Sequence, residues 1–388
     1  MDALLFSPFQ LRGTRLRNRI ALSPMLQYSA VGGRVNDWHL MHLGKFAAGG
    51  AGLVFMESTK VESRGCSTPR DVGLWKDEFI EPLRRITDLV KSNGAVPGIQ
   101  LSHAGRKGRR SVPWEGRVPL TACPGVDHGE EWELIGPSAI PHAKSYSTPR
   151  EMTRADIEEV LAAWGQAARR ADSAGFDVVE IHGAHGYLIH QFLSSAANQR
   201  VDEYGGTLEN RMRFAGEVVQ RIRHFWPETK PLFFRMSSVD EVGWSIEDSI
   251  ALARLLKTLG VDVIDCSAGG MSDVAASDQA PGYGYQVEYA RRIRSGADIK
   301  TMAVGMIIHS DQAEEILRQG SADLVALGRE LLHNPNWPVD AAQKLGIESP
   351  FTHVSPLYGF WLAKRARFAG RPSTWQRGIH SRPDEGDR

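Results

Sequence analysis

The chain has 388 residues, of which 42% are hydrophobic, and its 46 basic residues balance its 46 acidic ones. A chain of this length can bury a large core, and a formally neutral one lacks the electrostatic footprint that nucleic acids or anionic membranes require. No apolar run approaches the roughly 18 residues of a transmembrane helix. We therefore expect a protein with neither a nucleic-acid nor a membrane partner.

Three cysteines, Cys66, Cys123 and Cys266, lie far apart and form neither a CxxC pair nor another metal-ligand spacing. We expect no metal centre and no disulfide framework, which is typical of a cytoplasmic protein.

Short runs rich in valine, isoleucine and leucine alternate with amphipathic helical patterns along the chain. The predicted strands are residues 19–24, 51–57, 96–102, 176–182, 231–237, 261–267, 299–305 and 322–328. The clearest predicted helices are Arg154–Ala174, Leu208–Phe225, Ile246–Leu259, Tyr285–Ser295 and Asp311–Arg318. Strands separated by helices indicate a parallel sheet that is buried on both faces.

Eight strand–helix units in about 300 residues predict a (β/α)8 TIM barrel. A doubly wound sheet is the alternative, but no GxGxxG motif follows a strand and opens a helix, since the GYGYQV string at 282–287 has the wrong spacing. We assign residues 1–365 to the barrel domain, with 1–18 as a lid over its bottom and 106–149 as an excursion over its top after the third strand. Residues 366–388 are expected to form a tail that is disordered or lies at a subunit interface.

The fourth strand carries the clearest catalytic candidates, because reactive residues of such barrels sit at the carboxyl ends of the strands. In FDVVEIH, positions 178, 180 and 182 share one face, so His182 points toward the mouth of the barrel, and His185 and Tyr187 follow in the next loop. Two histidines without a matching carboxylate are a poor metal site. They can instead hydrogen-bond one carbonyl oxygen and stabilise an enolate. Tyr187 is a plausible acid, and Glu180 is expected to form a structural ion pair.

Two stretches around these residues point to a known family. The segments EIHGAHGYLIHQFL (180–193) and LSSAANQRVDEYGGTLENRMRF (193–214), with SPMLQY (23–28) and QLSHAGRKG (100–108), resemble the Old Yellow Enzyme family of FMN-dependent ene reductases. The likeness covers nearly the whole chain and is greatest to the bacterial thermophilic-like and xenobiotic-reductase-like branch. It implies FMN as cofactor, NADPH or NADH as hydride donor, a homo-oligomer, and ping-pong reduction of the C=C bond of an unsaturated carbonyl, nitro, maleimide or quinone compound. Larger members carry a four-cysteine cluster after the barrel, which a chain with no cysteine beyond Cys266 should lack.

The resemblance assigns roles to the residues that follow the strands. Residues expected to contact FMN are Ser23, Pro24, Met25, Leu26, Ser58, Gln100, Arg235, Gly305, Gly328 and Arg329. Residues expected to bind substrate are Tyr28, His182, His185 and Trp361, the last entering from a partner subunit. Tyr187, His182 and His185 are the expected catalytic residues, with Tyr187 as the proton donor. Arg235 would stabilise the anionic reduced flavin, and Arg329 and the two glycines would suit its phosphate.

Leu26 departs from the family pattern, which has cysteine or threonine at this position. A leucine side chain cannot donate a hydrogen bond toward the flavin, so the family's tuning of the flavin potential is in doubt here. The polar residues of the loop after the fourth strand are interpreted as structural, and these are Asn198, Arg200, Asp202, Tyr204 and Arg211.

Two other functions remain open. A cofactor-free lyase or aldolase would need a Schiff-base lysine at a strand end, but Lys60 lies past the second predicted strand and Lys300 opens the seventh. A flavin-binding protein without efficient turnover is the second alternative, which Leu26 makes worth testing.

Overall fold

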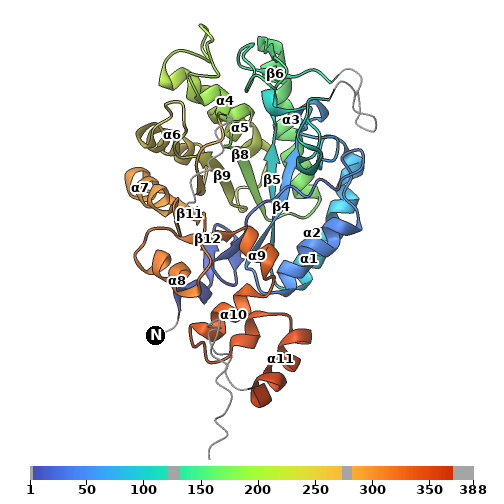
Figure 1. The fold of residues 1–388 in the computed structure, drawn as a ribbon, viewed down its shortest axis with the longest axis vertical. Helices are drawn as coiled ribbons and strands as arrows, with labels where there is room; N and C mark the ends of the chain where they lie inside the picture. Colours follow the sequence, from blue (N-terminus) through green and yellow to red (C-terminus); the bar gives the residue numbers. More distant parts are fainter. Residues whose placement is uncertain (1–2, 121–131, 273–281, 370–388) are drawn as a thin grey trace, which may run out of the picture.

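The computed structural model describes residues 3–120, 132–272 and 282–369. Eight parallel strands close into a barrel in the order β10-β11-β12-β3-β4-β5-β8-β9 (Figure 1). Their bounds are β3 Ile20–Leu22, β4 Leu53–Lys60, β5 Val96–Ser102, β8 Val178–Gly183, β9 Leu232–Ser237, β10 Val263–Ser267, β11 Lys300–Val304 and β12 Leu324–Leu327. The predicted TIM barrel and all eight predicted strands are confirmed.

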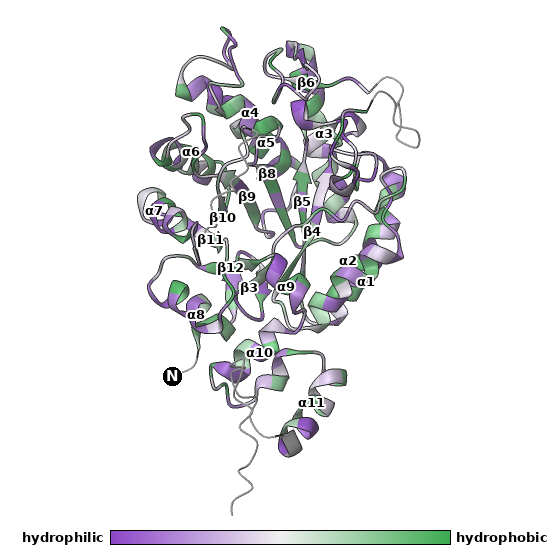
Figure 2. Ribbon diagram, in the orientation of Figure 1, coloured by the Kyte–Doolittle hydropathy of each residue, from purple (hydrophilic) through white to green (hydrophobic). Residues whose placement is uncertain are grey.

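Helices surround the barrel and turn their apolar sides toward it (Figure 2). They are α1 Asp37–Ala48, α2 Ile80–Ser92, α3 Arg154–Ser173, α4 Leu188–Leu193, α5 Leu208–Phe225, α6 Ile246–Thr258, α7 Val287–Ala297, α8 Ser310–Arg318, α9 Arg329–His333 and α10 Trp337–Lys344. The last helix, α11 Pro356–Ala369, lies away from the barrel, beyond α10 (Figure 1). The five helices predicted from periodicity are present, although α7 begins two residues later than expected. None of the helices within the described ranges is both long and apolar enough to cross a membrane.

The bottom of the barrel is closed by the amino-terminal segment, as predicted. Strands β1 (Phe9–Leu11) and β2 (Thr14–Leu16) form an antiparallel hairpin. The hairpin buries three apolar side chains, which join one cluster with the residues that open the barrel strands: Phe9, Leu11, Leu16, Leu53, Val178, Phe233 and Val263. The lower half of the barrel is therefore packed with apolar side chains, and polar side chains occupy only its upper half.

Strand β4 contains an irregularity that the sequence pattern did not reveal. Its pairing with β5 shifts between Met56 and Ser58, so Glu57 is an extra residue. Below this bulge Phe55 faces the barrel interior, and above it the register aligns Ser58 with Gln100. Because side chains alternate along a strand, one extra residue turns every later side chain to the opposite face.

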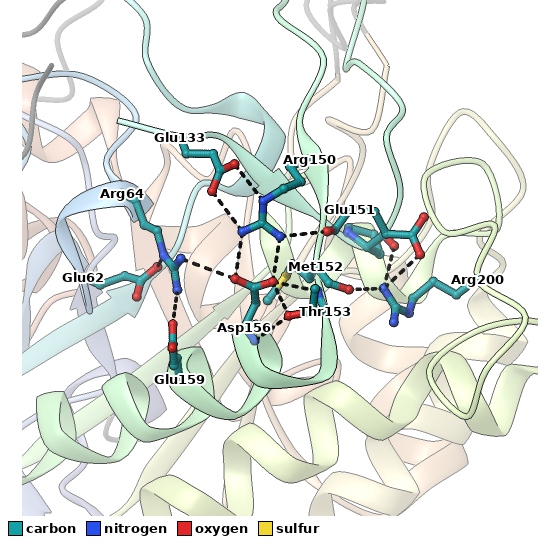
Figure 3. Close-up of polar contacts among 11 residues, drawn as sticks. Glu62, Arg64, Glu133, Arg150, Glu151, Met152, Thr153, Asp156, Glu159 and Arg200 are labelled. Atoms are coloured by element: carbon teal, nitrogen blue, oxygen red, sulfur yellow. Dashed lines mark hydrogen bonds and ion pairs between the residues drawn. The ribbon is translucent and has the colours of Figure 1, made fainter. Parts of the chain in front are cut away.

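The excursion after β5 lies at the carboxyl end of the barrel, where β6 (Ile135–Gly136) pairs with β7 (Arg150–Glu151), and its residues 121–131 fall outside the described ranges. A polar network fastens its end to the start of α3 (Figure 3). Arg150 donates to both carboxylate oxygens of Asp156, at 2.7 and 2.9 Å, and to both of Glu133, at 2.7 and 2.9 Å. Asp156 also accepts from the backbone N–H and hydroxyl of Thr153 in a capping box.

The loop after β8 is held by the polar residues that were interpreted as structural. Asn198 donates to the carbonyls of Phe192 and Tyr204. Arg200 pairs with Asp202 and donates to the carbonyl of Met152, which joins this loop to the network of Figure 3. The loops above the barrel therefore support one another.

Candidate active site

A cavity of about 390 Å³ opens at the carboxyl ends of β3, β9, β10, β11 and β12. A volume of this size is typical of small-molecule and cofactor sites. Predicted cofactor residues that line it are Ser23, Pro24, Met25, Arg235, Gly305, Gly328 and Arg329, together with His185. Other lining residues were missed at the level of the sequence, among them Ser267, Tyr285 and Gln286. Ser267 was detectable, because it ends the sixth predicted strand.

The wall of this cavity leaves little room for larger side chains at Gly305. The residue has φ +113°, and a Cβ atom there would lie 2.9 Å from the ring of Tyr285. Because Gly305 has no side chain, a bound group can approach the backbone of the turn after β11 closely.

Arg235 is the buried cation of the site. Its Nη1 donates to the hydroxyl of Ser23 at 3.0 Å, across the barrel, and its Nε lies 3.4 Å from Oδ2 of Asp265. The predicted ion pair of Glu180 is wrong: its Oε1 accepts from the amide of Gln100 at 2.8 Å, and Asp265 takes the ion pair with Arg235 instead. Burial raises the pKa of both Glu180 and Asp265, and the two carboxyl groups are neighbours. One proton shared between them relieves the repulsion of two buried charges.

The turn after β3 is shaped by its backbone. Tyr28 has φ +52°, an uncommon conformation for a residue with a side chain, and the backbone N–H of Gln27 donates to Glu57 at 2.8 Å. Burial raises the pKa of Tyr28, and the charges of Tyr187 and Asp71 raise it further. Leu26 lies in this same turn, half-buried.

His182, His185 and Tyr187 come together at the end of β8, as predicted. The rings of His182 and His185 are 5.2 Å apart between centroids, and those of His182 and Tyr187 are 4.8 Å apart. The backbone N–H of Ala184 donates to Nδ1 of His182, so the proton of this ring is on Nε2. Nε2 of His185 lies 2.6 Å from the hydroxyl of Ser267.

Both imidazoles are uncharged near neutral pH. Burial, then His185 and Arg235, lower the pKa of His182, and burial, then Arg235, lower the pKa of His185. A neutral histidine donates a hydrogen bond without bringing a net charge, so the pair suits a carbonyl oxygen better than a permanent anion.

Lys60 lies inside the barrel, although the sequence predicts a position beyond the second strand. It is the last residue of β4, not a residue beyond the strand, and it is fully buried. Its Nζ donates to the hydroxyl of Ser58 at 2.7 Å and lies 5.2 Å from the centre of the Tyr187 ring. The bulge at Glu57 explains the error, because regular alternation would place Lys60 on the outer face.

Trp361 is not brought to this site within its own chain. It lies on α11, at the opposite end of the molecule from α4 and β6 (Figure 1), with 63% of its surface exposed. Its expected role concerns a second subunit and stays a prediction. Cys66 and Cys266 are buried, and Cys123 falls outside the described residues. Within those residues no group of three or more histidine, cysteine or acidic side chains has metal-binding geometry.

Comparison with known proteins connects this geometry to a family. The profile of the NADH:flavin oxidoreductase / NADH oxidase family matches residues 4–348, which span the hairpin, the whole barrel and α10. The chain belongs to this family. The resemblance to the Old Yellow Enzymes is thereby confirmed.

Relatives and solved structures agree with this family. The chain is 47% identical over 350 residues to an NADPH dehydrogenase of Geobacillus sp. (strain WCH70), covering 89% of this chain and 96% of the relative. Among solved structures, the Old Yellow Enzyme homologue from Zymomonas mobilis has a TM-score of 0.70 and 27% identity, covering 88% of this chain and 92% of that one. A 2-naphthoyl-CoA reductase has a TM-score of 0.77 and 26% identity over 91% of this chain, but the match spans only 53% of that longer protein.

Members of the NADH:flavin oxidoreductase family are redox enzymes, so the chain is an oxidoreductase that uses FMN and NADPH or NADH. The cavity fits such a cofactor in chemistry as well as in size, because it offers a buried guanidinium, a hydroxyl and a glycine turn. Buried polar atoms at its edge lack a hydrogen-bond partner within the described residues, among them Nε of Arg235 and Oε1 of Gln286. Such atoms are usually completed by a ligand or by water.

Proposed function

We propose that the protein is an ene reductase, which reduces the C=C bond of α,β-unsaturated carbonyl compounds with hydride from NADPH or NADH. Related nitroalkenes, maleimides and quinones belong to the same proposal. The observation that supports it best is the cluster of two neutral histidines and a tyrosine beside the cofactor cavity. FMN, when bound, supplies the redox chemistry, taking hydride from the nicotinamide and passing it to the substrate.

Arg235, Ser23, Met25, Gly305, Gly328 and Arg329 would hold the cofactor, since they line one cavity. Arg235 is the central residue of this set, because Asp265 and Ser23 hold its guanidinium in place. Its positive charge favours an electron-rich ring beside it. Pro24 lines the same cavity, and Leu26, Ser58 and Gln100 are proposed to complete the ring site from β3, β4 and β5. Leu26 contributes shape but no hydrogen bond.

His182 and His185 would hold the carbonyl oxygen of the substrate. The Nε2–H of His182 is a donor, and His185 becomes one at Nδ1 when the hydroxyl of Ser267 donates to its Nε2. Two such donors stabilise the negative charge that develops on this oxygen when hydride reaches the β-carbon. Tyr28 is proposed to line the substrate pocket, and Trp361 to reach the same pocket in a partner subunit.

Tyr187 would supply the proton to the α-carbon. It follows His182 by five residues, and its ring packs edge-on against that histidine. A single tyrosine in contact with the oxygen-binding pair is well placed to protonate the carbon next to the carbonyl.

An anaerobic absorbance titration tests this function. The flavin bands near ~450 nm should bleach with NADPH and return when 2-cyclohexenone is added. Tyr187→Phe should slow the second step by about 100-fold and leave the first within about threefold, in keeping with the typical contribution of a general acid. Bleaching by NADPH with no recovery on any enone would favour a flavin-binding protein without turnover, and equal losses in both steps would remove Tyr187 as the proton donor.

A further inference from the structure

Lys60 is the most unusual ionisable residue at the carboxyl end of the barrel. None of its surface is exposed, although an ammonium group loses several kcal/mol of hydration when it is buried without partners. The bulge at Glu57 turns this side chain inward, and bulges of this kind recur next to active sites, where they re-aim a side chain.

The contacts of Lys60 point toward the catalytic tyrosine. Its Nζ makes a short hydrogen bond to Ser58, at 2.7 Å, and a longer ion pair with Oδ2 of Asp71, at 3.6 Å. Asp71 is itself held by the backbone N–H of Ser67 and the hydroxyl of Thr68, at 2.6 and 2.7 Å. The ammonium therefore lies between a loop carboxylate on one side and the face of the Tyr187 ring, 5.2 Å from its centre, on the other.

A second ammonium lies near the same ring. Nζ of Lys107 is 5.6 Å from the centre of the Tyr187 ring, and it donates to the backbone carbonyls of His185 and Gly270 at 2.9 and 3.1 Å. The two lysines come from different strand ends, β4 and the segment after β5. Two ammonium groups thus lie within 5.6 Å of the centre of the Tyr187 ring, whereas the neighbouring His182 is neutral.

We propose that Lys60 is a positioning residue for proton donation: its buried ammonium holds the Tyr187 ring and stabilises the phenolate that forms when this tyrosine protonates the substrate. The inference rests on the proposed function, in which Tyr187 is the acid. In that step the O–H bond of Tyr187 breaks, the electron pair of the enolate C=C bond forms the new C–H bond at the α-carbon, and the charge passes to the phenolate oxygen. Lys60 remains protonated, and water returns the proton to Tyr187 afterwards.

An ammonium 5.2 Å from the centre of the ring attracts the negative charge that develops on the phenolate, and in a buried site this attraction is large enough to alter the step. A hydrogen-bonded, ring-facing ammonium also restricts the ring to one orientation. Lys60→Met, which keeps the length of the side chain and removes the charge, should slow the reoxidation of reduced enzyme by an enone by at least about tenfold. Reduction by NADPH should stay within about threefold, because Tyr187 takes no part in it.

The rival explanation is that Lys60 only ties the loop of Asp71 to the barrel. Thr68→Val is the matched control, because it removes a hydrogen bond to the same carboxylate at 2.7 Å and leaves Lys60 in place. It should lower the melting temperature without changing the ratio of the two half-reaction rates. Lys60→Arg, which keeps the charge, should recover most of the reoxidation rate lost in Lys60→Met, and the FMN midpoint potential should be the same in all three variants.

A double-mutant cycle with Tyr187→Phe decides the assignment. If Lys60 acts through Tyr187, Lys60→Met should slow Tyr187→Phe no further, within about twofold. Three outcomes would overturn the proposal. They are a further loss of reoxidation rate in the Tyr187→Phe background equal to that in wild type, an equal loss of rate in both half-reactions, and a Lys60→Met enzyme with unchanged rates. Because Lys60→Met leaves Asp71 buried without its cation, the neutral pair Lys60→Met with Asp71→Asn is measured alongside and should show the same reoxidation defect.

The two levels of inference fail differently. Wild-type enzyme that is reduced by NADPH but not reoxidised by enones contradicts the proposed function itself. Wild-type turnover with a slow Tyr187→Phe variant and a normal Lys60→Met variant contradicts the role of Lys60 alone.

Discussion

Replacing Asp156 with asparagine should destabilise the protein by about 2 to 3 kcal/mol at pH 7. Asp156 is buried at the first turn of α3, where it accepts two hydrogen bonds from Arg150 and two from Thr153 (Figure 3). An asparagine keeps one acceptor oxygen and loses the charge. A helix cap contributes about 1 kcal/mol, and a hydrogen bond to a charged group about 1.5 to 3 kcal/mol. The sum is reduced because Arg150 is partly exposed.

Glu133→Gln is the matched control, because Glu133 binds the same arginine at the same distances. Its side chain is 47% exposed, whereas that of Asp156 is 11% exposed. Solvent screens the outer pair, so this variant should lose less than about 1 kcal/mol. Urea unfolding at pH 7, followed by tryptophan fluorescence, measures both. Equal losses in the two variants would refute the reasoning, since burial would then make no difference.

The loss in Asp156→Asn should also shrink in acid. The hydrogen bonds from Arg150 and then those from Thr153 hold the pKa of Asp156 well below its usual range. Its contribution to stability is therefore complete above the unfolded pKa of about 3.9 and decreases as pH falls toward the folded value. At pH 3.5 about 70% of the unfolded carboxyl is protonated while the folded one stays ionised, and this proton uptake reduces the difference between wild type and variant by about 0.7 kcal/mol. A difference that is constant from pH 7 to pH 3.5 would contradict the assignment.

Three further predictions concern the cavity and the carboxyl pair below it. Arg235→Met should weaken FMN binding by at least about 100-fold, because it removes the buried cation, and flavin fluorescence would measure it; an unchanged dissociation constant would exclude Arg235 from the site. Gly305→Val places a side chain against Tyr285 at φ +113° and should weaken FMN binding about tenfold or more, while an unchanged circular dichroism spectrum verifies the fold. Glu180→Gln should stabilise the protein, and the gain should grow above pH ~4.5. The pKa of Glu180 is raised, so its protonated carboxyl favours folding and this contribution is lost as pH rises through the folded pKa. A difference in unfolding free energy that does not change with pH would refute this.

The barrel could be predicted from the sequence because each of its strands has a local pattern that identifies it. Apolar runs such as 176–182 and 231–237 are buried on both faces, and the amphipathic helices between them repeat with helical period. The candidate site at the end of β8 followed from the same logic, because His182 ends the predicted strand 176–182, and His185 and Tyr187 follow within five residues. Residues within a few positions of one another at the end of a strand stay close in space whatever the rest of the fold.

Relations between distant strands were decided only by the tertiary structure. Glu180 was expected to pair with a cation, but the barrel register aligns His182 with Arg235 and Arg235 with Asp265, so the guanidinium is taken by the next strand. Lys60 was expected to lie past the end of the second strand, and a single extra residue in β4 turns its side chain toward Ser58 and Tyr187. A bulge has no strong local signature, because it depends on how one strand pairs with its neighbour. The local sequence pattern thus determined which strands and helices form and which candidate site residues follow a strand. Pairing between strands determined which buried charged side chains meet.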